Sequence, residues 1–79
     1  MPTSHTYVRQ VAGNVRAELS RSGLLQKQLA IRVGKSDEWV SRRIRTNDPQ
    51  PMSTADLALF AEALSVTPGR LASTGEVQS

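Results

Sequence analysis

The chain contains no cysteine, so neither a disulfide bond nor a thiolate metal site can support its fold. It has one histidine, His5, which we interpret as a bystander. There is no glycine-rich phosphate loop, and no spacing typical of paired catalytic carboxylates or of metal ligands. These absences argue against an enzyme and against a bound cofactor, metal or small-molecule ligand.

Long apolar runs are also absent, because no uncharged stretch approaches the roughly 20 apolar residues that a membrane span needs. The first residues, Met-Pro-Thr-Ser-His, hold no apolar signal core. We therefore expect a cytoplasmic protein without a membrane partner. The 79 residues contain no internal repeat and no Gly/Ser-rich linker, which predicts one domain over 1–79 with one small core.

The charge is positive and unevenly distributed. The formal net charge is +3, but residues 21–45 carry seven cations and two anions, a balance of +5. Residues 46–79 carry one cation and four anions, a balance of −3. This distribution would draw a polyanion such as nucleic acid to the middle of the chain. Ordinary solvated helix faces would give the same pattern, so charge alone does not decide.

The apolar spacing of the N-terminal third predicts one long helix that ends at Gly23, with a stripe formed by Val8, Val11, Ala12, Val15 and Leu19. Gly13 lies inside this pattern and costs about 1 kcal/mol relative to alanine. Either another helix approaches closely there or the helix is suboptimal.

Two short helices are expected next. The first covers about 26–33 and ends at Gly34, with inward-facing Leu29, Ala30 and Val33. Ser36 is the expected N-cap of the second, which runs to about residue 45 with Val40 and Ile44 inward. Asp37 and Glu38 fall in its first turn, where the helix dipole favours negative charge.

The remaining chain predicts a loop and two more helices. Two prolines within 46–51 exclude a helix and a central strand there. Ser53 and Asp56 have the spacing of a capping box, and the helix that follows has an apolar stripe of Leu57, Phe60, Ala61 and Leu64. Thr67 and Pro68 begin a short fifth helix that contains Leu71. We expect an all-α, compact five-helix bundle with its core over 6–72 and a frayed tail over 74–79.

Residues 26–45 have the features of a helix-turn-helix. Two short helices cross steeply only where the contact residue is small and the turn tolerates a positive φ. Ala30 is the small contact residue here, and Gly34 is the turn residue that tolerates a positive φ. Val40 would then fill the angle between the helices. The opposite face of the second helix is left free to enter a major groove.

Three segments carry a family resemblance: Gln-x-x-Leu-Ala-x-x-Val-Gly at 26–34, Trp-Val-Ser-Arg-Arg-Ile at 39–44, and Ser-Thr-Ala-Asp-Leu-Ala-Leu-Phe-Ala-Glu-Ala-Leu-Ser-Val at 53–66. In order and spacing they resemble the Cro and repressor family of bacteriophage regulators, the XRE-type helix-turn-helix group, over residues 7–72. The resemblance implies a lambda-repressor-like DNA-binding domain. It further implies a transcriptional regulator, Cro-like or a compact immunity repressor, that binds an operator in double-stranded DNA in the bacterial host cytoplasm.

Two residues depart from the family pattern. Leu25 stands where the family usually has a Ser or Thr cap, which puts the start of the second helix in question. Arg43 stands where many members have an apolar residue of the recognition helix, and Ile44 supplies that apolar residue here. For that reason the sequence defines the register of the DNA-facing side only to within a fraction of a turn.

Val40 and Ile44 define the buried side of the third helix. At about 100° per residue, the opposite side is centred on Arg42 and Glu38, with Trp39, Ser41 and Arg45 at its margins. Arg42 is the best candidate to contact a base, because its planar fork matches the N7 and O6 acceptors of guanine. The alternatives are a solvated arginine or a phosphate contact.

Three further residues complete the set of candidates for base contacts: Glu38, Asp37 and Ser41. Glu38 either accepts from a cytosine amine or pairs with Arg42 and complements the helix dipole. Asp37 lies nearer the buried side, where a structural role is the alternative.

The candidates for DNA backbone contacts surround this face. The resemblance implies that Gln26 holds a phosphate at the start of the first motif helix, where exposed N–H groups favour anions. Position suggests the same role for Lys35, Ser36, Arg43, Arg45 and Asn47. Trp39, the only tryptophan, either lies against the sugar-phosphate backbone or is a partly buried core ring.

Two functions from different classes are open at this point. The leading hypothesis is the DNA-binding regulator, and the alternative is an antitoxin-type protein-interaction module whose DNA binding is secondary. A nonspecific architectural protein fits poorly, because no basic tail or intercalating wedge is present. A homodimer on a palindromic site and a monomer are both compatible with the sequence; the apolar candidates for a dimer contact are Leu59, Val66, Leu71 and Val77.

Overall fold

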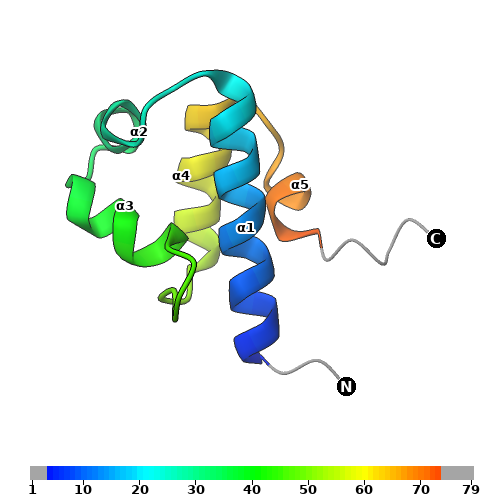
Figure 1. The fold of residues 1–79 in the computed structure, drawn as a ribbon. Coiled ribbons are helices and arrows are strands. Elements are labelled where there is room, and N and C mark those ends of the chain that lie inside the picture. The colour runs from blue at the N-terminus through cyan, green and yellow to red at the C-terminus, as the bar shows by residue number, and fades with distance from the viewer. Residues whose placement is uncertain (1–3, 74–79) are drawn as a thin grey trace.

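The computed structural model describes residues 4–73, with side chains from Thr6 onward, and within this part of the chain helices are the only regular secondary structure (Figure 1). The helices are α1 (Ser4–Ser22), α2 (Gln26–Val33), α3 (Asp37–Ile44), α4 (Thr54–Leu64) and α5 (Pro68–Ala72). Over residues 4–73, the predicted all-α class with five helices is confirmed. The predicted frayed tail, with Val77, lies outside the described residues.

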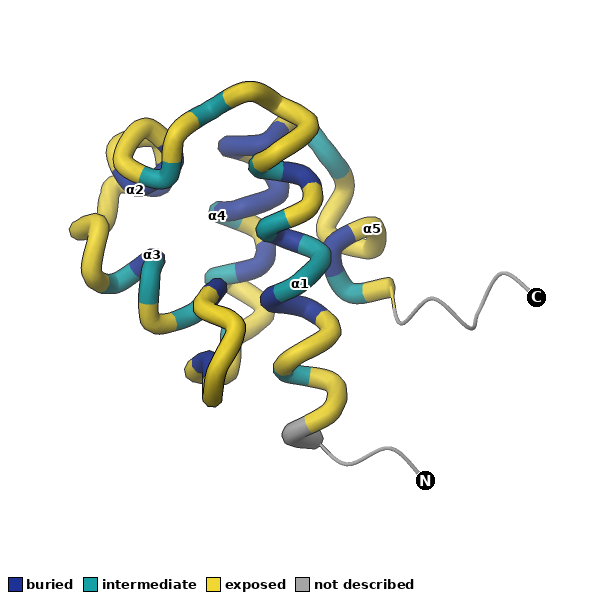
Figure 2. The backbone as a smooth tube through the Cα atoms, viewed as in Figure 1, coloured by how far each residue is buried: buried dark blue, intermediate teal, exposed yellow. Residues whose placement is uncertain are grey.

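α1 and α4 form the centre of the bundle, with α2 and α3 on one side and α5 on the other (Figure 1). The inward sides of these helices are buried, whereas the outer surfaces of α2 and α3 are exposed (Figure 2). Phe60 of α4 is fully buried and is the largest side chain of the core. The predicted stripes supply most of that core, including Val15, Leu29, Val40 and Leu71.

The helices end where the sequence places stop and cap residues. Gly23 and Gly34 both have φ of 76°, in the left-handed region that glycine adopts without strain. At the start of α4, the Ser53 hydroxyl accepts from the N–H of Asp56, and the Asp56 carboxylate accepts from the N–H of Ser53. This reciprocal pair is the predicted capping box.

Gly13 has room for a β-carbon. A β-carbon added there meets only the flexible end of Arg16, at 3.5 Å, within ordinary van der Waals contact. No other helix approaches at this point. Of the two predicted explanations for this glycine, the suboptimal helix is the one observed.

Glu18 joins α1 to α5. Its nearly buried carboxylate accepts from Arg70 of α5 at 2.8 Å and from Arg21 of its own helix. Burial by itself raises the pKa of Glu18, but the hydrogen bond from Arg70 and the charges of Arg21 and Arg70 outweigh it, so the pKa lies below its ordinary value. Asn14 adds hydrogen bonds to the carbonyls of Leu71 and Ser73.

Candidate nucleic-acid interface

α2 and α3 pack against each other through a three-residue connection over 34–36. The carbonyl oxygen of Ala30 accepts from the backbone N–H groups of Gly34 and Lys35, both at 3.0 Å, which fixes the start of the connection. Ala30 and Val40 are both buried in the common core. The position of α3 on the bundle is therefore set by packing and by backbone hydrogen bonds together.

The side chain at the N-cap position of α2, Leu25, makes no hydrogen bond to the first turn of the helix. Leu25 is 68% exposed and makes no cap hydrogen bond, but its N–H donates to the Gln28 side chain at 2.8 Å. The second helix therefore begins at Gln26, where the sequence predicts it, despite the departure at Leu25.

The outward side of α3 carries Arg42 and Glu38. The Arg42 guanidinium donates to the Glu38 carboxylate at 2.6 Å, and their side chains are 49% and 73% exposed. Exposed i,i+4 pairs contribute only about 0.3–0.5 kcal/mol, so the pair restrains the guanidinium without locking it. Of the two roles considered for Glu38, pairing with Arg42 is the one present in the unbound chain.

Gln26 and Asp37 connect the start of α2 to the start of α3. The Gln26 amide nitrogen donates to the Asp37 carboxylate at 3.0 Å. In the unbound chain Asp37 therefore makes a structural contact, the alternative to the base contact considered for it. Because an amide nitrogen carries two hydrogens, Gln26 keeps a second donor beyond this bond.

The remaining predicted contacts lie around both ends of α3. The Ser36 hydroxyl caps α3 by accepting from the N–H of Trp39 at 3.0 Å. Arg45 is exposed, and its Nε donates to the carbonyl of Asp48 at 3.0 Å. Lys35 and Asn47 are exposed and Ser41 is half-buried.

Trp39 is a partly buried core ring, which is the second of its two predicted roles. It stacks on Phe60, with 5.7 Å between the ring centroids and 26° between the planes. The Lys35 ammonium lies 5.3 Å from the Trp39 centroid. The ring thus links the DNA-facing candidates to the centre of the core.

Arg43, one of the predicted phosphate contacts, is held within the bundle in the unbound chain. Its side chain is only 18% exposed and pairs with Asp56 at 3.5 Å, while the guanidinium lies over Trp39. A guanidinium can be buried in this way because it is planar and weakly hydrated and stacks on aromatic rings. Arg43 therefore belongs to the scaffold that holds α3 against α4.

Sequence reasoning missed two arginines that bind the C-terminal ends of helices. Arg16 of α1 donates to the carbonyl of Ile44 at the end of α3, at 2.6 Å. Arg32 of α2 donates to the carbonyl of Ala63 near the end of α4, at 3.3 Å. Cations are favourable at these negative helix ends. Nothing in the local sequence marks either pairing, because the partners are 28 and 31 residues apart.

Within residues 4–73, no helix is long and apolar enough to cross a membrane. In the same part of the chain, no three His, Cys, Asp or Glu side chains gather where they could hold a metal ion. No protein-family model, curated protein or solved structure matches this chain.

Proposed function

We propose that the chain is a sequence-specific regulator of transcription that binds double-stranded DNA, of the Cro-like or compact immunity repressor kind. In this proposal residues 26–45 act as a helix-turn-helix, and α3 enters the major groove of an operator. The observation that carries it is the two-sided character of α3. Val40 and Ile44 are buried in the core, while Arg42 and Glu38 stand exposed on the opposite side.

The charges around α3 support this proposal. Three exposed cations lie near the two motif helices. Lys27 is in the first turn of α2, Lys35 lies just before α3, and Arg45 follows α3. The N-terminal ends of α2 and α3 are joined by the Gln26–Asp37 hydrogen bond. Helix N-termini and flanking cations both attract phosphates.

The contacts divide into two kinds. Arg42 contacts a guanine edge, and Glu38 orients its guanidinium. The second amide hydrogen of Gln26, with Lys35, Arg45 and Asn47, contacts the phosphate backbone. Trp39 and Arg43 do not touch DNA in this scheme, because they stack on each other between α3 and α4.

Selection of bound fragments from a random duplex pool by the purified protein tests this function. We expect one sequence motif to be enriched at physiological salt. Arg42→Ala should lose the preference at one G·C position, and Glu62→Gln, an exposed change on α4, should keep the parent motif. A selected pool that stays indistinguishable from the input would reject the proposal and favour the protein-interaction alternative.

A further inference from the structure

The C-terminal end of α3 is tied to α1 by Arg16. This half-buried side chain donates through Nη1 to the carbonyl oxygen of Ile44, the last residue of α3, at 2.6 Å. Its Nη2 lies 3.5 Å from the place that a β-carbon on Gly13 would occupy, so the guanidinium lies back along α1. A hydrogen bond is directional, and a guanidinium holds its donors in one plane. The bond therefore restrains the angle of the α3 terminus as well as its distance from α1.

Two other hydrogen bonds at this end join α3 to the loop that follows it. The N–H of Arg45 donates to the carbonyl of Ser41 at 3.0 Å, and the N–H of Gln50 donates to the carbonyl of Arg42 at 2.8 Å. These bonds shape the end of α3 and its loop, but they do not attach either of them to a neighbouring helix. The bond from Arg16 makes that attachment.

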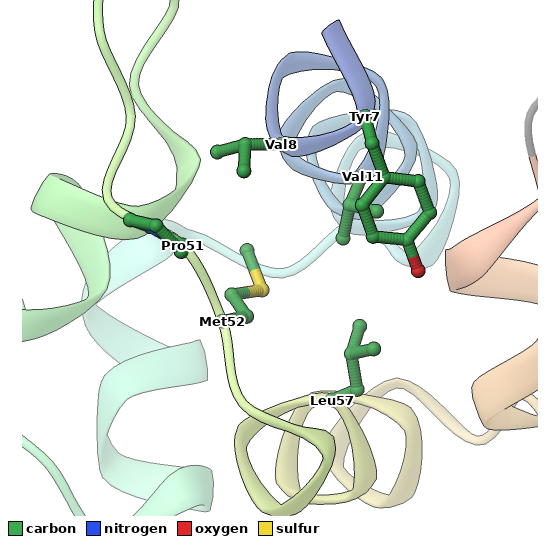
Figure 3. Close-up of a pocket in the computed structure, with 6 residues that line it drawn as sticks. All are labelled: Tyr7, Val8, Val11, Pro51, Met52 and Leu57. Carbon is green, nitrogen blue, oxygen red and sulfur yellow. The ribbon is translucent and has the colours of Figure 1, made fainter. Parts of the chain in front are cut away.

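Apolar packing alone does not fix the segment after α3 against α1. Pro51 and Met52 of the loop, with Tyr7 and Val8 of α1, line an open apolar groove of about 230 Å³ (Figure 3). Closely packed interiors have few voids larger than a water molecule, so the described side chains meet loosely here. Packing is also non-directional. It buries Ile44 in the core, whereas the hydrogen bond sets the angle at which α3 leaves it.

The angle of α3 decides where Arg42 lies. Arg42 is two residues before Ile44, and its side chain is 49% exposed. The exposed pair with Glu38 restrains it only weakly, so its place depends mainly on the backbone that carries it. A group that reads a base must be held within about 0.5 Å of its productive position. A flexible cation that contacts a phosphate can adjust along its stem and carries no sequence information.

We propose that Arg16 is a positioning residue for sequence recognition. By holding the carbonyl of Ile44, it fixes the end of α3 and with it the place of Arg42 in the major groove, without touching DNA itself. This inference rests on the proposed function. It follows that the preference for the selected motif depends on Arg16, whereas the number of phosphate contacts does not.

Amide hydrogen exchange followed by NMR tests the attachment in the free chain. Arg16→Met keeps an unbranched stem and removes the donor. The N–H of Arg45 should then exchange at least about fivefold faster relative to the N–H of Leu57 in α4. Arg32→Met is the matched control, because it removes the same kind of bond, from Arg32 to the carbonyl of Ala63 near the end of α4. It should leave this relative rate at the parent value, and an unchanged rate in Arg16→Met would overturn the proposal.

The second experiment measures sequence preference, the ratio of the affinities for the selected motif and for random duplex, at a temperature where the parent and both variants are folded. Arg16→Met should lower this ratio at least about fivefold, the lower limit for one bidentate base contact. Its salt slope should stay that of the parent, because no phosphate contact is lost. Arg32→Met should keep the parent ratio.

Three results would overturn the positioning role and leave the proposed function in place: a parent ratio in Arg16→Met, an equal loss in Arg16→Met and Arg32→Met, or a reduced salt slope in Arg16→Met. An equal loss would identify a general effect of stability, and a reduced slope would identify Arg16 as a phosphate contact. A parent protein that enriches no motif would instead reject the proposed function, and the positioning role with it.

Discussion

The guanidinium of Arg43 lies over the ring of Trp39, with its central carbon 4.0 Å from the ring centroid. The same guanidinium forms an ion pair with the carboxylate of Asp56, which belongs to the capping box at the start of α4. Trp39 in turn stacks on Phe60 in the core. This chain of contacts holds the middle of α3 to α4 and explains why an arginine occupies a position where an apolar residue was expected.

Arg43→Ala should therefore lower the free energy of unfolding, by about 1–2 kcal/mol, because a cation–π contact with Trp39, an ion pair with Asp56 and a hydrogen bond to the Trp39 carbonyl are lost together. Urea denaturation followed by the fluorescence of Trp39 measures this. Arg45→Ala, which removes an exposed side chain, should change stability by less than about 0.5 kcal/mol.

The same pair of variants should show the reverse order in DNA binding. Arg45→Ala should reduce the slope of log K against log salt by about 1, the value for one lost phosphate contact. Arg43→Ala should keep the parent slope once the folded fraction is accounted for. A reduced slope for Arg43→Ala, with Arg45→Ala unchanged, would show that the two roles are assigned the wrong way round.

Arg42→Ala should weaken binding to the selected motif by about 1–3 kcal/mol and relax the preference at one G·C position. Its thermal melting should stay close to that of the parent, because the exposed pair with Glu38 contributes little. Competition binding with single-base variants of the motif measures the change. Equal losses on specific and random duplexes would identify Arg42 as a phosphate contact instead.

Ala30→Leu should destabilise the fold by about 1–3 kcal/mol or more, because the buried β-carbon of Ala30 leaves no room for a larger side chain near the connection from α2 to α3. If the proposed function holds, DNA binding should weaken in parallel, although none of the proposed DNA contacts is changed. The midpoint of thermal unfolding is the measurement. A variant that melts and binds like the parent would mean that α2 and α3 do not pack closely at this residue.

Gly13→Ala should stabilise the protein by about 0.4–1 kcal/mol, since it lowers the conformational entropy of the unfolded chain and meets no obstacle in α1. Gly34→Ala is the matched control. It should destabilise, because Gly34 has φ of 76° at the end of α2. Denaturation midpoints for the two variants should therefore move in opposite directions.

Glu18 should contribute to stability in a pH-dependent way. Because its pKa is lower in the folded chain than its ordinary value, its contribution is present above that ordinary value, 4.5, and is lost as the pH falls through the folded value. Glu18→Gln should flatten the loss of stability on acidification. Melting curves over this acidic range measure it, with Glu62→Gln, an exposed carboxylate on α4, retaining the parent dependence.

The sequence correctly predicts the helix boundaries that depend on residues close together in the chain. Gly34 ends α2, Ser36 caps α3, and the box between Ser53 and Asp56 begins α4, all within three residues of the groups they bind or terminate. The buried stripes also follow, because a helix repeats every 3.6 residues or so.

The contacts that could not be predicted join residues far apart in the chain. Glu18 and Arg70 are 52 residues apart, and Arg16 and Ile44 are 28 apart. Such pairs depend on the angles at which helices cross and on which side chains those angles bring together, and neither is contained in a periodic pattern. The pairing of Arg43 was not predicted for the same reason, since its partner Asp56 lies on another helix.

The hydrogen bond from Arg16 to the last carbonyl of α3 has a consequence for the thermodynamics of binding. Together with the bond from the N–H of Gln50 to the carbonyl of Arg42, it anchors the C-terminal end of α3 to α1 and to the following loop. The N-terminal end is anchored by Ser36 and by the Gln26–Asp37 pair. With both ends restrained in the free chain, α3 has little order left to gain on contact with a partner. Association should accordingly proceed without coupled folding. The heat-capacity change on binding should be no larger than the value expected from the apolar area buried between two rigid surfaces.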